Sequence, residues 1–210
     1  NVLDIFKISP KELEGGIVCS VVPQITHIVK LAAEKILEKD VMVLGPGIKT
    51  GMNILMDNPA QVGSDLIADA VGAIGEYEPP MIIFDMGTAT TVCVVDGKKN
   101  YIGGMILPGV RTSLDALTAR AAQLSGIDLE APKRVIGKNT IECMKSGIVY
   151  SNAALIDGVI LRMEEELGEK ATVIATGGLA KSIVPYCKEE VILNDDLLLK
   201  GLLRVYLKNR

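Results

Sequence analysis

The sequence predicts an α/β fold, and three observations support this. A buried-type strand at 16–22, an amphipathic helix at 24–38 and a strand at 40–44 have the spacing of a βαβ unit with a parallel strand pair. Residues 81–107 then have the pattern of three strands, the last two joined by an Asp96-Gly97 turn. Strands and helices alternate to the end of the chain, with strands predicted at 171–176 and 191–194 and a last helix at 195–208.

Composition indicates a globular protein. The chain has 210 residues, 49% hydrophobic and 23% charged, which is enough for one large or two small domains with real cores. A net charge of −4 without any basic run argues against a nucleic-acid partner. No apolar run reaches the ~18 residues of a membrane span, so we expect no membrane partner and a cytoplasmic location.

The cysteines and the histidine exclude several kinds of site. The four cysteines lie far apart and form no CxxC pair, which favours reduced structural thiols in a cytosolic protein. His27 is the only histidine, so a histidine-based triad or a poly-histidine metal site is excluded. His27 falls in a helical pattern and is expected to be a packing or surface residue.

Residues 75–80 mark the best boundary between two halves, which predicts domains at 1–79 and 80–210. In the first half, Asn58-Pro59 is predicted to start a helix that fades at Gly75. In the second half, helices are predicted at 110–124 and 141–167, with Asn139 or Thr140 as the cap of the longer one.

Asp85 ends a buried strand and precedes Gly87 and several threonines. The backbone N–H groups of such a tip favour anions, and the acid can hold a cation that offsets phosphate charge. The stretch therefore suits the phosphates of a nucleotide. The alternative is an ordinary hairpin whose small residues fit a tight bend, and local pattern alone does not separate the two.

A second candidate site lies in the helix predicted from Pro59. Gly63 would fall in its second turn, where glycine costs about 0.8–1 kcal/mol against alanine, so a close approach is indicated. Asp65 and Asp69 share a face, although a solvated acidic face is the simpler interpretation. The loop 45–51 is not a Walker A motif, because Ile48 stands where that motif needs glycine.

Five short motifs follow in an order that closely resembles type III pantothenate kinases, from about Ile17 to the C-terminus. They are Asp57-Asn58-Pro59 with Gly63-Ser64-Asp65, Asp85-Met86-Gly87-Thr88-Ala89-Thr90, Gly103-Gly104-Met105-Ile106-Leu107-Pro108-Gly109, Ile136-Gly137-Lys138-Asn139-Thr140 and Ala175-Thr176-Gly177-Gly178. Each motif is weak by itself, but five in this order are highly specific.

The resemblance implies two ribonuclease H-like (actin-like ATPase) domains with ATP in the cleft between them, and a homodimer with pantothenate near the subunit boundary. It implies transfer of the ATP γ-phosphoryl group to the terminal hydroxyl of pantothenate, the first step towards coenzyme A. Such enzymes need Mg²⁺ and a monovalent cation, K⁺ or NH₄⁺.

The resemblance also implies residue roles. Asp65 matches the general base, and Asp85 matches the ligand of the monovalent cation. The matches to pantothenate contacts are Met56, Gly63, Ser64, Leu66 and Thr140, and the matches to ATP contacts are Gly87, Thr88, Gly177 and Gly178. Two positions depart from the family, which usually has arginine in place of Leu66 and often tyrosine in place of Met56.

The family's first phosphate motif, Asp-x-Gly-Asn-Thr, has no match in residues 1–30. We therefore expect the first domain to be incomplete at its N-terminus and the 210-residue chain to be inactive alone. The resemblance leaves two further alternatives. One is a non-catalytic relative acting as an accessory regulator of transcription, which the presence of Asp65 and Asp85 disfavours. The other is a kinase of the same fold acting on a sugar or acetyl group.

Overall fold

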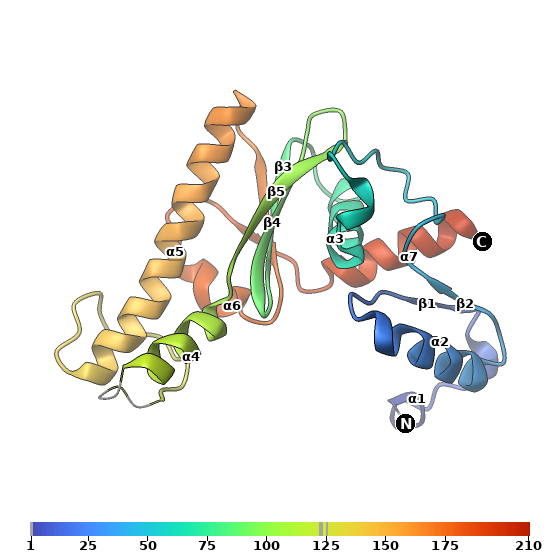
Figure 1. Ribbon diagram of the computed structural model, residues 1–210, viewed down its shortest axis with the longest axis horizontal. Coiled ribbons are helices and arrows are strands. Elements are labelled where there is room, and N and C mark those ends of the chain that lie inside the picture. The colour runs from blue at the N-terminus through green and yellow to red at the C-terminus, as the bar shows by residue number, and fades with distance from the viewer. Residues whose placement is uncertain (1, 122–123, 125) are drawn as a thin grey trace. The chain divides into compact units, whose positions relative to one another are not determined.

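The computed structural model describes residues 2–121, 124 and 126–210 (Figure 1). The chain forms two compact units. The first contains the chain up to Met52, Asp57–Gly75 and Leu197–Arg210, and the second contains Asn53–Met56 and Glu76–Asp196. No helix among the described residues is long and apolar enough to cross a membrane.

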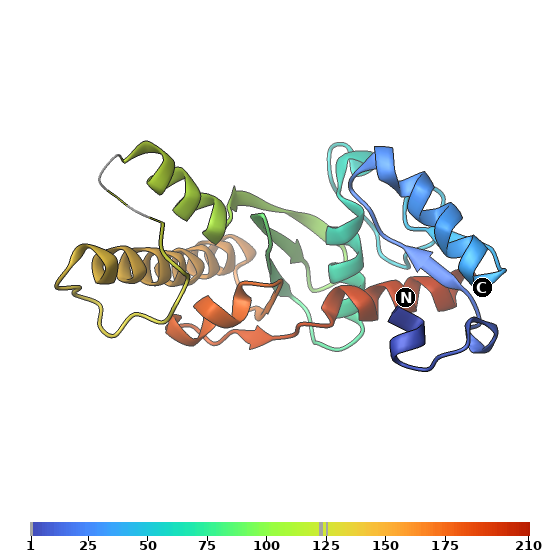
Figure 2. The same cartoon turned by 90° about the horizontal axis from the view of Figure 1, so that it is seen from below.

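The first unit is built on the predicted βαβ element. Strands β1 (Gly16–Val18) and β2 (Val41–Val43) pair in parallel, and helix α2 (Pro23–Leu37) connects them. Helix α2 lies on one face of the pair and helix α7 (Leu197–Asn209) on the other (Figures 1 and 2). The short helices α1 (Val2–Ile5) and η1 (Pro10–Glu12) precede this element.

The apolar side of α2 is less covered than its sequence pattern predicts. None of the residues of α2 is buried, and Ile28 keeps 65% of its surface exposed. His27 is exposed, as expected for a surface residue. A helix whose only sheet partner has two short strands finds too little apolar surface to bury a whole side.

Helix α3 (Ser64–Ile74) packs closely against α7. A Cβ atom on Gly72 would overlap the carbonyl of Leu197, and one on Gly201 would overlap the carbonyl of Ala68. Glycine at both crossing points therefore lets the two backbones approach. Around this contact lies the core of the first unit, formed by Leu44, Ala68, Val71, Leu202 and Val205.

The start of α3 differs from the prediction. Asn58 and Pro59 open a separate 3-10 turn, η2 (Pro59–Gln61), in which Asn58 Oδ1 accepts a hydrogen bond from Ala60 N at 3.3 Å. Gly63 is then the N-cap of α3, with an extended ψ of 139°. The prediction that Gly63 lies inside the helix was wrong, so its low helix propensity has no cost there.

The second unit contains one five-stranded sheet in the order β5-β4-β3-β6-β7. Strands β3, β4 and β5 are antiparallel neighbours, whereas β6 and β7 run parallel to β3. The strands are β3 (Met81–Met86), β4 (Ala89–Val95), β5 (Tyr101–Pro108), β6 (Thr172–Thr176) and β7 (Ile192–Leu193). The segment 53–56 joins the edge of β5 through a bridge between Ile54 and Tyr101.

Helices α4 (Val110–Arg120), α5 (Thr140–Leu167) and α6 (Ala180–Ile183) pack on one face of this sheet, and η3 (Val184–Tyr186) follows α6. Phe84 of β3 lies in this core and is fully buried. Asn139 caps α5, since its Oδ1 accepts from Glu142 N at 2.9 Å. The helix predicted at 110–124 ends at Arg120, and residues 122–123 of that prediction lie outside the described residues.

Candidate active site

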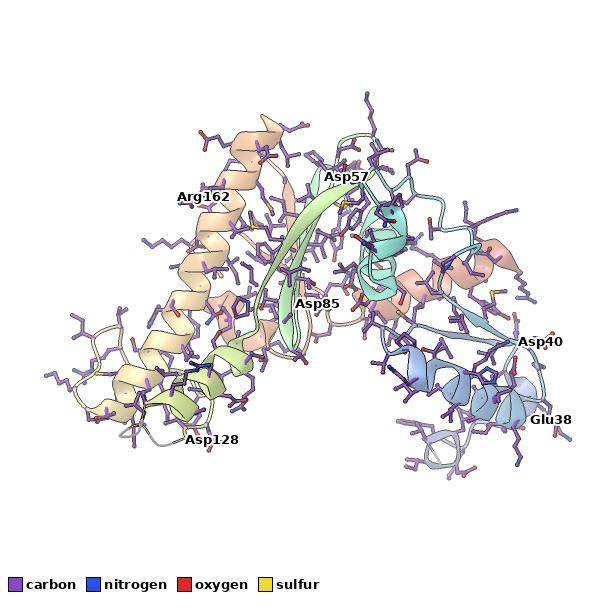
Figure 3. The ribbon with its side chains drawn as sticks, in the orientation of Figure 1. Glu38, Asp40, Asp57, Asp85, Asp128 and Arg162 are labelled. Atoms are coloured by element: carbon purple, nitrogen blue, oxygen red, sulfur yellow. The ribbon has the colours of Figure 1, made fainter. Side chains whose placement is uncertain are left out.

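Asp85 lies near the carboxyl end of β3 (Figure 3). Its register partners are Thr91 on β4 and Thr176 on β6. Directly paired residues on neighbouring strands point to the same face of a sheet, so one carboxylate and two hydroxyls share this face.

Gly177 makes room for the Asp85 carboxylate. A Cβ atom there would lie 2.5 Å from Asp85 Oδ1 and 2.6 Å from the backbone nitrogen of Met86, closer than real Cβ contacts. Gly177 also has a φ of +91°, which side chains rarely adopt. The Ala-Thr-Gly-Gly motif therefore places a bare backbone against the acid, whereas Gly178 has open space around it.

The turn between β3 and β4 is held from the helical side of the unit. Gly87 N donates to Ala89 O at 3.0 Å, and the Thr112 hydroxyl of α4 donates to Thr88 O at 2.7 Å. Gly109 packs against the same carbonyl, and any Cβ there would overlap it. The last glycine of the Gly-Gly-Met-Ile-Leu-Pro-Gly motif thus supports the turn that carries Thr88.

The donor atoms at Asp85 fit a hard cation. Thr91 Oγ1 is buried and has no hydrogen-bond partner, which is costly unless a ligand contacts it. Carboxylate and hydroxyl oxygens are the ligands that such cations prefer. No group of three or more His, Cys, Asp or Glu side chains that could hold a metal ion is found in the described part of the chain.

Asp65 lies in the first turn of α3 and is half-buried. Its Oδ1 accepts a hydrogen bond from Leu66 N at 2.9 Å. The Asp65 carboxylate also lies over Gly63, because a Cβ on that glycine would overlap Asp65 Oδ1. A carboxylate placed in this way can act as a proton acceptor.

Ser64 connects the start of α3 to the end of β1. Its hydroxyl donates to Ser20 O at 3.2 Å and accepts a hydrogen bond from Cys19 Sγ at 3.3 Å. Burial raises the pKa of the Cys19 thiol above 9.0; the Ser64 hydrogen bond opposes this, and the charges of Asp65 and Asp69 add to it.

The burial of Asp69 shows that the simpler interpretation of Asp65 and Asp69, a solvated acidic face, was wrong. Asp69 lies one turn after Asp65 on α3, yet it keeps only 1% of its surface exposed. The periodicity placed both acids on one face correctly. Ala68 to Ala73 are all buried, so α3 has no solvated acidic face beyond its first turn.

The structure does not bring Met56 and Thr140 together. Met56 Sδ lies 3.9 Å from the Cβ position of Gly103, and Gly103 lines a cavity of about 240 Å³ with Met163 of α5. Thr140 is the exposed first residue of α5. At 1.5 Å per residue the helix separates Thr140 from Met163 by about 35 Å, more than a small-molecule substrate spans.

The predicted residues therefore form three local groups. Asp85, Gly87, Thr88 and Gly177 come together at the β3–β4 turn, Gly63 to Leu66 form the start of α3, and Met56 and Thr140 lie apart in the second unit. Cys19 and Ser20 were not among the predicted site residues, yet they contact Ser64 across 45 and 44 residues of chain. No local pattern signals such a contact.

Solved structures with similar folds support the predicted architecture. A Baf family transcriptional activator from Campylobacter jejuni matches with a TM-score of 0.62 at 18% identity, over 100% of this chain and 88% of that one. The ethanolamine utilization protein EutJ from Carboxydothermus hydrogenoformans matches with a TM-score of 0.50 at 16% identity, over 88% and 72%. At these identities the likeness concerns the fold alone, and it confirms the predicted α/β class.

Sequence relatives are much more similar. The type III pantothenate kinase of Exiguobacterium sp. (strain ATCC BAA-1283 / AT1b) is 43% identical over 210 residues, which is 100% of this chain and 82% of the relative. That of Bacillus cytotoxicus is 44% identical over 198 residues, 94% of this chain and 76% of the relative. The profile of the type III pantothenate kinase family matches residues 2–162. The chain therefore belongs to the type III pantothenate kinase family.

Proposed function

We propose that this protein is a pantothenate kinase, which converts ATP and pantothenate to ADP and 4'-phosphopantothenate in the first step of coenzyme A biosynthesis. The observation that carries the proposal is family membership together with a carboxylate, Asp65, in the first turn of α3. Alcohol phosphorylation needs a positioned base, because an alcohol is a poor nucleophile.

In the proposed reaction the terminal hydroxyl oxygen of pantothenate attacks the γ-phosphorus of ATP. The new O–P bond forms as the bond from the γ-phosphorus to the β,γ-bridging oxygen breaks, and ADP leaves. Asp65 accepts the hydroxyl proton. A hydrogen bond from Leu66 N to Asp65 Oδ1 holds the carboxylate in its orientation.

We assign pantothenate contacts to the start of α3, Gly63 to Leu66, and to Met56 and Thr140. Thr140 begins α5, whereas Met56 lies beside Gly103, which lines a cavity with Met163 near the other end of that helix. This separation supports a homodimer in which each site takes Met56 and Thr140 from different subunits. Leu66 and Met56 replace the arginine and tyrosine usual in the family, so this protein contacts its substrate there through apolar side chains.

We assign ATP phosphate contacts to Gly87 and Thr88, and adenosine contacts to Gly177 and Gly178. A monovalent cation, K⁺ or NH₄⁺, would be held by Asp85 with the hydroxyl of Thr91. The cation and Mg²⁺ supply positive charge that offsets the phosphate charge. The buried Thr91 oxygen without a partner is the support for this assignment.

We propose domains at residues 1–79 and 80–210; α7, at the end of the second, packs on α3 of the first. We place the enzyme in the cytoplasm, where its four free thiols stay reduced. A role as an accessory regulator of transcription is the alternative. The acids at positions 65 and 85 favour the enzyme, because a regulator has no use for a base.

One assay tests the proposal. The 210-residue chain, and a form extended at its amino terminus by a segment with the Asp-x-Gly-Asn-Thr motif, are given ATP, Mg²⁺ and K⁺ with pantothenate, a sugar or acetate. In the extended form we expect pantothenate-dependent ADP release that requires K⁺ and falls by orders of magnitude in Asp65→Asn. ADP release that is equal for all three acceptors, or full activity in Asp65→Asn, would refute the assignment.

A further inference from the structure

Side chains from three separate segments meet at the start of α3. Ser64 Oγ donates to Ser20 O at 3.2 Å and accepts from Cys19 Sγ at 3.3 Å. The hydroxyl of Ser20 in turn accepts a hydrogen bond from Thr26 of α2 at 2.9 Å. The loop that follows β1 is therefore tied to two helices, and one of these ties is beside Asp65.

These contacts fix the direction in which the Ser64 hydroxyl donates. A hydroxyl has one proton and two lone pairs, and here the proton points at the Ser20 carbonyl. The Cys19 thiol occupies one lone pair, which leaves the other free to accept. Ser64 therefore cannot donate to the neighbouring Asp65 carboxylate, and it presents an acceptor to anything that lies over the helix start.

The thiol remains a donor at neutral pH. Cys19 is half-buried, and burial is the main reason that its pKa lies above 9.0. The negative charges of Asp65 and Asp69 raise the pKa further. A neutral S–H group is thus the form that meets Ser64, and the thiol is a poor nucleophile in this setting.

We propose that Cys19 is a positioning residue of the kinase: its thiol holds the Ser64 hydroxyl as a hydrogen-bond acceptor for pantothenate and keeps the first turn of α3, with Asp65, in place. The kinetic part rests on the proposed function, because it takes Asp65 as the base. The substrate group that Ser64 would accept from is a hydroxyl or an amide N–H. The structural part of the proposal, the contact between the Cys19 thiol and the start of α3, does not depend on the proposed function.

Kinetics with the active form of the enzyme test the proposal. We expect Cys19→Ala to lower kcat/KM for pantothenate about three- to tenfold, the worth of one net hydrogen bond, with KM for ATP unchanged. Cys19→Ser keeps a donor and should stay within about twofold of wild type. Cys187→Ala removes another half-buried thiol, in the second unit, and should have no effect.

A double mutant separates positioning from general loss of packing. In a Ser64→Ala background, Cys19→Ala should cost nothing further, because its partner is already absent. Equal losses from Cys19→Ala in both backgrounds would overturn the proposal. So would an unchanged kcat/KM in Cys19→Ala.

Thiol titration tests the contact without any assay of activity. The pH dependence of iodoacetamide labelling, followed by mass spectrometry of the Cys19 peptide, gives the thiol pKa in the folded protein. We expect a lower pKa in Asp65→Asn than in wild type, and no change in Asp40→Asn, where the replaced acid is exposed. Identical thiol pKa values in wild type and Asp65→Asn would refute the contact. Failure of pantothenate turnover alone would refute only the proposed function.

Discussion

The carboxylate of Asp65 occupies the space where a side chain on Gly63 would begin. A Cβ at position 63 would overlap Asp65 Oδ1, and it would lie 3.7 Å from Val21. The backbone of Gly63 is ordinary, with φ −57° and ψ 139°, so any residue could adopt it. Position 63 needs glycine because the Asp65 carboxylate fills the space of a side chain, and not because the backbone there requires it.

Gly63→Ala should therefore lower activity without unfolding the protein. The added methyl group moves the Asp65 carboxylate off its position, and misplacement of a catalytic group by about 1 Å can cost roughly 100-fold in rate. We expect kcat to fall ten- to 100-fold, as measured by ADP release. The melting temperature should change by less than about 3 °C.

Gly147→Ala is the matched control. Gly147 lies within α5 with nothing close to its Cβ position, so alanine there should raise stability by up to about 1 kcal/mol and leave kcat unchanged. If Gly63→Ala kept full activity, the carboxylate would not need this position, and Asp65 would be a weaker candidate for the base.

Helix α3 shows which parts of the site could be predicted from the sequence. The helix and its acid were readable from the pattern. The reason for Gly63 was not, because the pattern placed this glycine inside the helix, whereas it is the N-cap and lies under the Asp65 carboxylate. The start of the helix was not, because Asn58-Pro59 is an equally good start signal for the 3-10 turn that the structure has. A start signal specifies a first turn but not how many turns follow it.

Gly177→Ala should damage the second unit. Its φ of +91° is strained for alanine, and the methyl group would overlap Asp85 Oδ1 and the backbone of Met86. Strain of this kind costs about 1–3 kcal/mol. We expect a melting temperature lower by several degrees and loss of kinase activity.

Gly178→Ala tests nucleotide binding without disturbing the fold. Nothing lies within 4 Å of its Cβ position, so the melting temperature should not change. If adenosine passes this turn, KM for ATP should rise while KM for pantothenate stays the same. An unchanged KM for ATP would remove Gly178 from the nucleotide site.

Contacts between segments distant in sequence were the part that the sequence could not predict. The last helix, α7, follows the second unit in the chain but packs on α3 through Gly72 and Gly201. Cys19 likewise contacts Ser64 across 45 residues. Periodicity assigns a face to each helix, yet it does not say which distant surface will cover that face.

Asp96 is expected to make the folding stability depend on pH. Its carboxylate accepts from Lys98 N at 2.9 Å and from Asn100 N at 2.8 Å in the β4–β5 turn. Burial acts to raise the pKa of Asp96, but these hydrogen bonds and that from the Asn100 side chain outweigh it and place the pKa below its ordinary value of 3.8. Because the folded-state pKa is the lower one, the stabilisation is complete above pH ~4 and is lost as pH falls through the folded-state value.

We expect Asp96→Ala to lower the free energy of unfolding by about 1 kcal/mol at pH 7, a modest figure because solvent screens this turn. Urea unfolding at pH 7 and at pH 2.5 measures the difference, which should shrink at the lower pH. Asp115→Ala, on the exposed side of α4, is the control and should change little at either pH. A difference that stays the same at both pH values would show that the charge of Asp96 is not what the turn uses.

Thr90 and Thr91 provide a matched pair for the cation site. Both have a buried Oγ1 without a hydrogen-bond partner, but as neighbours on β4 they point to opposite faces of the sheet. Thr91 pairs with Asp85, whereas Thr90 pairs with Met86 on the core side. Only Thr91 is placed to share a cation with the carboxylate.

Valine at either position removes a desolvated oxygen at nearly constant volume. Without K⁺, both Thr90→Val and Thr91→Val should match or exceed wild-type stability, by up to about 1 kcal/mol, because no hydrogen bond is lost. Adding K⁺ should raise the melting temperature of wild type and of Thr90→Val, since a ligand that binds the folded state stabilises it, and should raise that of Thr91→Val less. Equal K⁺ shifts in all three proteins would exclude the Thr91 hydroxyl as a ligand and leave Asp85 without its proposed partner.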